Sequence, residues 1–182
     1  MAALERMYEK TLSTDADWQP QLRDILKRAT LTQKVAFVGV GHPMRGDDFV
    51  GSFIIKALMT KRIGADKLVL FDAEDGIEWV MSRVREPNPK HLIILDACEM
   101  NANPGKVALI PLAQTNYPFF TTHGIPLKLL VTKLLPSVDS SILAIQPARM
   151  GFNEGLSSPV LAAALSISNF VETTLKGSEP NV

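Results

Sequence analysis

Two aspartates stand side by side where an apolar strand pattern turns into a helix, in VAFVGVGHPMRGDDFVGSFIIKAL at residues 35–58. A single aspartate at a helix start is common, because its carboxylate accepts backbone N–H groups and suits the helix dipole. Two consecutive aspartates do not both cap one helix. We expect Asp47 to be the N-cap, which leaves Asp48 free to bind something else.

Two further residues complete a candidate site. Asp96 ends the apolar run HLIILDA at 91–97, and His123 lies in the segment TTHGIP before another helical pattern. Two carboxylates and an imidazole at one sheet edge suit a divalent metal of the zinc or nickel type, with positions left for water or substrate. The residues alone leave simpler alternatives open, since an aspartate can cap a turn and a loop histidine is commonly solvated.

The loop is a poor match for phosphate binding. A dinucleotide motif needs glycine at position 44, which is Met44. Gly41 and Gly46 have the spacing of a nucleoside-triphosphate loop, but Asp47 and Asp48 replace its lysine and hydroxyl residue. Two carboxylates would repel a polyphosphate, which argues strongly against a nucleoside-triphosphate site.

Other polar residues are weaker candidates for the functional site. Gly41, His42 and Arg45 lie in the same loop and are candidates for contacting a substrate, although Arg45 could equally be solvated. Asp72 follows the second strand pattern and is a candidate third acid, one strand further out. His91 opens a strand at its amino end, so we expect it to be structural.

These residues depend on an alternation of strand and helix patterns. We expect strands at 34–41, 67–73, 91–97, 106–110 (an edge strand) and 140–146, and helices at 48–62, 76–84, 124–135 and 157–175. This order predicts an α/β three-layer sandwich with a mostly parallel, roughly five-stranded sheet. Ligands of such sheets gather at the carboxyl ends of the strands, and a central pair of strands 34–41 and 91–97 would bring Asp48 and Asp96 together. On the helix at 48–62 the expected inward residues are Phe49, Phe53, Ile54, Ala57 and Leu58.

We expect the chain to divide into an N-terminal helical extension at 1–33, one α/β domain at 34–176 and a flexible tail at 177–182. WQPQLRDILKRA predicts a helix in the extension, with Leu22, Ile25 and Leu26 on one side. The extension could pack on the domain, mediate a homodimer or contact a substrate, and the sequence leaves these open.

Composition narrows the function classes. The chain has 182 residues, which fits one domain with a substantial core. Its 19 basic and 19 acidic residues balance, which gives no electrostatic case for nucleic acid. No apolar run is long enough to insert into a membrane. A single cysteine excludes a disulfide framework and suits a reducing, cytoplasmic setting.

Taken together, the motifs resemble those of the hydrogenase maturation proteases. The family's first motif, a strand followed by G-x-G-N-x-x-x-x-D-D/E-G, stands here as GVGHPMRGDDFVG. LIILDACEM, TTHGIPLKLL and AIQPARMGF match its later motifs in order. The stretch DACEMNANPGKVALI followed by TTHGIPL is similar to the branch that processes hydrogenase 3 of formate hydrogenlyase. The resemblance covers about residues 34–175.

The resemblance implies a phosphorylase/hydrolase-like fold and a nickel-recognising endopeptidase. Such an enzyme removes the C-terminal extension of the large-subunit precursor of a nickel–iron hydrogenase once nickel is inserted. Carried over by position, the family's catalytic and metal-binding residues are Asp48, Asp96 and His123. Nickel would be supplied by the precursor, and zinc or cadmium could occupy the same site.

Two departures from the family pattern bear on function. His42 replaces the family asparagine, where we expect it to replace a hydrogen bond rather than bind metal, and Phe49 replaces a glycine. These departures keep open a second hypothesis, a nickel-centre docking or chaperone module that does not cleave. A third hypothesis is a divalent-metal hydrolase acting on small molecules.

Overall fold

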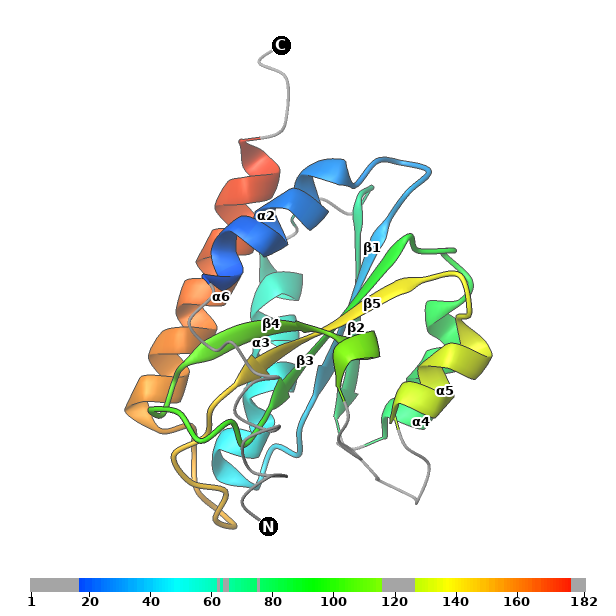
Figure 1. Cartoon of the computed structure of the whole chain (residues 1–182). Coiled ribbons are helices and arrows are strands. Elements are labelled where there is room, and N and C mark those ends of the chain that lie inside the picture. The colour runs from blue at the N-terminus through cyan, green and yellow to red at the C-terminus, as the bar shows by residue number, and fades with distance from the viewer. Residues whose placement is uncertain (1–16, 62, 64–65, 75, 116–126, 178–182) are drawn as a thin grey trace.

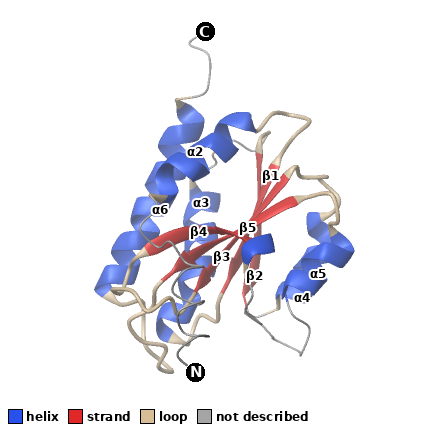
Figure 2. Ribbon diagram, in the orientation of Figure 1, coloured by secondary structure: helices blue, strands red, loops and turns tan. Residues whose placement is uncertain are grey.

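The computed structural model describes residues 17–61, 63, 66–74, 76–115 and 127–177. Its elements are α2 (Trp18–Arg28), β1 (Val35–Val40), η1 (Gly46–Phe49), α3 (Val50–Thr60), β2 (Leu68–Glu74), α4 (Ile77–Val84), β3 (His91–Ala97), β4 (Val107–Pro111), η2 (Leu112–Gln114), α5 (Leu127–Leu134), β5 (Asp139–Ile145) and α6 (Ser158–Lys176). Helices α2, α3 and α6 cover one face of the sheet, and α4 and α5 cover the other (Figure 1, Figure 2). The predicted three-layer α/β sandwich is confirmed.

The sheet has five strands in the order β2-β1-β3-β5-β4. All neighbouring strands are parallel except β4, which runs antiparallel to β5 at the edge. The predicted central pairing of β1 with β3 and the predicted edge strand are therefore both confirmed. Because β1, β2, β3 and β5 point the same way, the loops that follow them meet at one end of the molecule.

Two apolar cores hold the layers together. Every residue of β1 is buried, and its side chains alternate between the faces of the sheet. Val35 and Phe37 pack in the core under α2, α3 and α6, whereas Ala36 and Val38 pack in the core under α4 and α5. Such continuous apolar strands are typical of a sheet covered on both faces.

The helix in the N-terminal extension packs on the domain. Leu22 and Leu26 of α2 are almost fully buried in the core shared with α3 and α6. The Trp18 ring meets the Phe170 ring of α6 edge-on, with 5.1 Å between their centroids. The extension was expected to pack on the domain, mediate a homodimer or contact a substrate. The contacts of α2 show that it packs on the domain. None of the described helices is both long and apolar enough to cross a membrane.

The start of the helix predicted at 48–62 differs from the prediction. Residues Gly46–Phe49 form a 3₁₀ turn, and the α-helix begins only at Val50. A 3₁₀ turn has fewer residues per turn than an α-helix. The α-helical spacing therefore does not give the correct orientation of Phe49, which lies in the 3₁₀ turn. Phe49 is half-buried rather than in the core, with its ring 6.2 Å from that of Phe53 and the Lys56 ammonium 5.0 Å away over its face. Phe53 and Ala57 are also only half-buried, whereas the burial of Ile54 and Leu58 is confirmed. The structure places α5 within the helix predicted at 124–135, whose residues 124–126 lie outside the described part.

Two glycines let α3 approach the sheet closely. A Cβ on Gly51 would overlap the carbonyl oxygens of Leu95 and Val40, and one on Gly39 would overlap the carbonyl oxygen of Gly51. The backbone of α3 therefore lies directly against β1 and β3. This contact fixes the distance of the η1 turn, and so of Asp48, from the end of β3.

Gly51→Ala is expected to destabilise the protein by roughly 1–3 kcal/mol, because the added methyl must push α3 away from the sheet. Chemical denaturation measures the change in free energy of unfolding. Gly155→Ala is the matched control, since no atom lies within 4 Å of the added Cβ. Equal stabilities of the two variants would contradict the close approach of α3.

Candidate functional site

The loop after β1 positions Asp48 through its own backbone. Gly41 has a φ of 135°, and a Cβ there would overlap the carbonyl oxygen of Asp48. The loop can therefore fold back tightly only with glycine at this position. The backbone N–H of His42 donates to Oδ2 of Asp48 at 3.0 Å. The Asp48 carboxylate is thereby held beside the loop while remaining half-buried.

Asp47 does not cap a helix, contrary to the sequence-based prediction. Its carboxylate is fully buried and accepts four hydrogen bonds from the segment before α6. Oδ2 accepts from the N–H groups of Ala148 at 2.8 Å and Arg149 at 3.0 Å, and from Oγ of Ser157 at 2.8 Å. Oδ1 accepts from the N–H of Ser157 at 2.6 Å. The 3₁₀ turn directs this side chain inward, where it joins two loops that are about a hundred residues apart in sequence.

These hydrogen bonds also set the charge state of Asp47. Burial by itself would raise the pKa of its carboxyl, but the bonds from Ser157, Arg149 and Ala148 outweigh burial and hold the pKa below the ordinary value. Asp47 is therefore a structural anion with its hydrogen-bonding capacity used. Its neighbour Asp48 accepts the His42 N–H and does not join this set of hydrogen bonds.

Asp96 is a buried carboxyl with an unsatisfied oxygen. It lies near the end of β3 with 2% of its surface exposed, and its Oδ2 has no hydrogen-bond partner among the described residues. Burial raises its pKa well above the ordinary value, and the negative charge of Asp48 raises it further, against a hydrogen bond from the N–H of Ala97. The charge of Asp48 thus acts on Asp96, as expected for two carboxyls at the same edge of the sheet.

A cation could be held between the buried Asp96 and the half-buried Asp48, whose charges repel each other. A divalent metal would satisfy the free oxygen of Asp96 and offset the repulsion from Asp48. The third predicted ligand, His123, lies outside the described residues. Over the ranges that the structure describes, no set of three His, Cys, Asp or Glu side chains could hold a metal. The described residues thus offer a metal the carboxyl groups of Asp48 and Asp96. Further ligands would have to come from other residues or from a substrate.

The structure also shows the contacts of the other candidate residues. Nδ1 of His42 accepts the N–H of Met44 at 3.1 Å, so the side chain makes a local hydrogen bond, as expected. Arg45 is exposed, on the same loop. Asp72 is not a third acid of the site, because it forms an ion pair with Lys56 at 3.1 Å. His91, at the other end of β3, forms a hydrogen bond with Ser141 at 3.2 Å, consistent with a structural role.

Gln146 organises the loop that follows Asp96, a role that the sequence did not reveal. Its side-chain oxygen accepts the N–H groups of Met100 at 2.7 Å and Ala102 at 3.3 Å. Its amide nitrogen donates to both carboxylate oxygens of Glu99, at 3.0 and 3.1 Å. The available signal was a glutamine directly after the buried strand β5, in AIQP. The loops after β3 and β5 are therefore connected through one buried amide.

Comparisons with known proteins show which proteins this chain is similar to. The model of a family described as hydrogenase maturation protease matches residues 53–174. The hydrogenase 3 maturation protease of Escherichia coli is 30% identical over 135 residues, which cover 73% of this chain and 85% of that protein. A crystal structure of a hydrogenase 3 maturation protease has a TM-score of 0.71 at 27% identity and covers 84% of this chain and 95% of its own. The NiFe hydrogenase maturation protease of Thermococcus kodakarensis shares the fold, with a TM-score of 0.75 at 20% identity over 85% of this chain and 98% of its own.

Asp47→Asn is expected to lower the free energy of unfolding by roughly 3 kcal/mol at neutral pH, because an amide cannot accept all four hydrogen bonds. The pKa of Asp47 is lowered in the folded protein, so its stabilising effect is present above the ordinary aspartate pKa and is lost as the pH falls through the folded value. Urea unfolding across the acid range should therefore show the two proteins converging at low pH. Asp24→Asn, on the exposed side of α2, is the control and should change the stability by less than about 0.5 kcal/mol. A constant gap between Asp47→Asn and the wild type at all pH values would contradict this role.

Asp96→Asn is expected to stabilise the metal-free protein at neutral pH by about 1–2 kcal/mol, or roughly 2–8 °C in Tm. The pKa of Asp96 is raised on folding, so the folded state loses stability as the pH rises from the ordinary aspartate pKa toward the raised value. A neutral amide removes this loss. Differential scanning calorimetry at several pH values gives the comparison, and a variant less stable than the wild type at neutral pH would show that the Asp96 carboxylate is not strained by burial.

Proposed function

The chain is a protease of the hydrogenase maturation protease family, and we propose that it removes the C-terminal extension of a nickel–iron hydrogenase large-subunit precursor after nickel insertion. The single observation that supports a metal-dependent reaction is the pair Asp48 and Asp96. One carboxyl is buried with a free oxygen, and the other lies close enough to raise its pKa. A cation would satisfy the free oxygen of Asp96 and offset the repulsion between the two carboxyls, whereas an apolar group would do neither.

The metal belongs to the substrate in this proposal. Nickel already inserted in the precursor would bring its own protein ligands, so the protease needs to supply only a partial set. Asp48 and Asp96 are two of these, and His123 is the proposed third. A partial set explains how cleavage can depend on nickel insertion, because a nickel-free precursor offers nothing for the carboxylates to bind. Zinc or cadmium would be competitors for the same donors.

The proposed chemistry is hydrolysis of one peptide bond. Bound nickel supplies Lewis acidity, which can polarise the scissile carbonyl or lower the pKa of an attacking water. A carboxylate oxygen that is not coordinated to the metal accepts the proton of that water and returns it to the leaving amine, so the site ends the cycle in its starting protonation state. The close packing of α3 against β1 and β3 positions the η1 turn near the end of β3.

The loop from Gly41 to Arg45 is the proposed contact with the precursor backbone. Gly41 keeps the loop close to Asp48, and His42 holds the Asp48 carboxylate through its backbone N–H. The imidazole of His42 is half-buried, and Arg45 is exposed beside it. Their position next to the carboxylate pair supports this assignment.

Processing is expected to require nickel in the precursor and all three proposed ligands. Intact-mass analysis of the precursor mixed with this protein should show loss of the C-terminal peptide only when nickel is loaded. Asp48→Ala, Asp96→Ala and His123→Ala should each slow processing by at least about 100-fold, since each removes a group from the reacting centre. Asp72→Ala is the matched control, because Asp72 is ion-paired with Lys56 and should remain dispensable.

A fully active Asp96→Ala or His123→Ala variant would contradict the assignment. Binding of the precursor with no change of mass, with nickel confirmed, would instead favour a docking or chaperone module. Turnover of small esters or amides without a protein partner would favour a general metal hydrolase.

A further inference from the structure

Two loops at the site end of the molecule form one continuous surface. The first is residues 41–46, after β1, and the second is residues 147–157, between β5 and α6. The N–H of Asn153 donates to the carbonyl of Met44 at 2.8 Å, and the N–H of Gly46 donates to the carbonyl of Glu154 at 3.2 Å. Together with the Asp47 hydrogen bonds, these contacts make the two loops a single ledge beside Asp48. We call it the site ledge.

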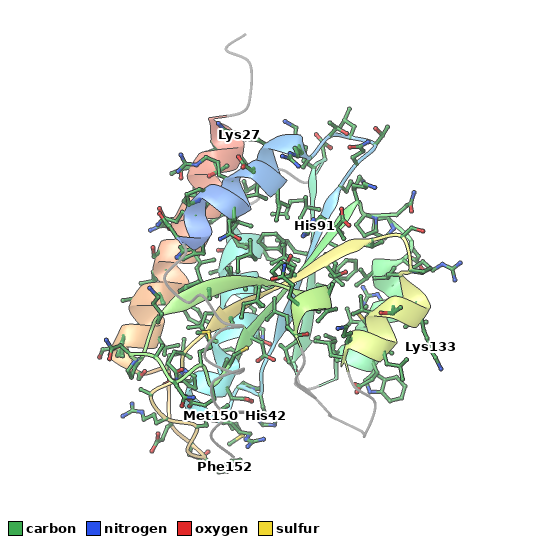
Figure 3. All side chains as sticks on the ribbon, viewed as in Figure 1. Lys27, His42, His91, Lys133, Met150 and Phe152 are labelled. Carbon is green, nitrogen blue, oxygen red and sulfur yellow. The ribbon has the colours of Figure 1, made fainter. Side chains whose placement is uncertain are left out.

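The site ledge exposes large apolar side chains. Met44 is 44% exposed, Met150 is 42% exposed and Phe152 is 67% exposed. Met150 and Phe152 are drawn together with His42 at one end of the molecule, far from Lys27 on α2 (Figure 3). Exposed phenylalanine and methionine contribute little to folding stability, and such side chains are common where a partner covers them.

The charges of the second loop of the ledge pair with each other, and the first loop adds the exposed Arg45 beside Met44. The only charged residues of the 147–157 loop are Arg149 and Glu154, and they pair with each other at 3.1 Å between Nε and Oε2. The surface around Met150 and Phe152 therefore offers no unpaired charge from its own loop. A charged segment would therefore gain little from the 147–157 loop, whereas apolar side chains would remove Met44, Met150 and Phe152 from water.

A bound polypeptide has to continue past the carboxylate pair on both sides of its scissile bond. The ledge begins at Gly41, whose backbone touches Asp48, so it is the surface that a bound chain meets next to the reacting centre. We propose that Met44, Met150 and Phe152 bind an apolar segment of the precursor that adjoins its scissile bond. The proposal rests on the proposed function for the identity of the substrate, and it adds a surface that selects the substrate by hydrophobic contact.

The test is the double variant Met150→Gln/Phe152→Gln in the full-length protein. Steady-state processing of the nickel-loaded precursor should show KM raised about 10-fold or more with kcat nearly unchanged, because the lost contacts bind the substrate without involving the reacting atoms. The control is the double variant Leu31→Gln/Met59→Gln. Leu31 is 67% exposed and Met59 is 45% exposed, which matches the test pair, and both lie away from the ledge. The conservative variant Phe152→Leu should retain most of the affinity.

Binding separates this inference from the proposed function. Precursor affinity measured by surface plasmon resonance should fall by about 10-fold or more for the test pair and stay unchanged for the control pair. If the wild type binds but does not cleave, and the test pair still weakens binding, the protease proposal fails and the ledge proposal stands. If the wild type cleaves, and the test pair leaves both KM and affinity unchanged, the ledge proposal fails alone. Equal losses in the test and control pairs would also overturn it.

Discussion

The site depends on one buried anion that takes no part in the chemistry. The Asp47 carboxylate collects four hydrogen bonds from Ala148, Arg149 and Ser157, and it thereby ties the turn after β1 to the segment that leads into α6. A buried carboxylate left without these donors would be costly, so the loops and the anion require each other. Once Asp47 is fixed inward, the next residue in the 3₁₀ turn faces the end of β3.

Asp48 and Asp96 differ from Asp47, because their arrangement lowers the stability of the folded protein. Asp96 is buried with an unsatisfied oxygen, and the Asp48 charge adds to the penalty for ionising it. Strained groups of this kind concentrate at functional sites, where the missing partner is a ligand. The buried aspartates Asp47 and Asp96 thus differ: the protein satisfies the carboxylate of Asp47, whereas an oxygen of Asp96 has no partner among the described residues.

Much of the fold was predictable because its signals are local. Continuous apolar strands, the glycine-containing turn and the alternation of elements predicted a parallel sheet with Asp48 and Asp96 at one edge. Asp47 was misassigned because its partners lie about a hundred residues away, and no local pattern reports such a contact. The same limit applies to Gln146, whose importance depends on how the loops after β3 and β5 meet. Phe49 was misplaced because a single 3₁₀ turn shifts the helical phase.

The central claim is that the carboxylate pair binds nickel that arrives with the precursor. Nickel K-edge X-ray absorption of the loaded precursor, alone and freeze-quenched after mixing with the protein, tests this directly. The account predicts that oxygen or nitrogen ligands are added to nickel on mixing, and that the added oxygen contribution is absent with the Asp48→Ala/Asp96→Ala variant. An unchanged nickel spectrum in a sample where the complex has formed would contradict it.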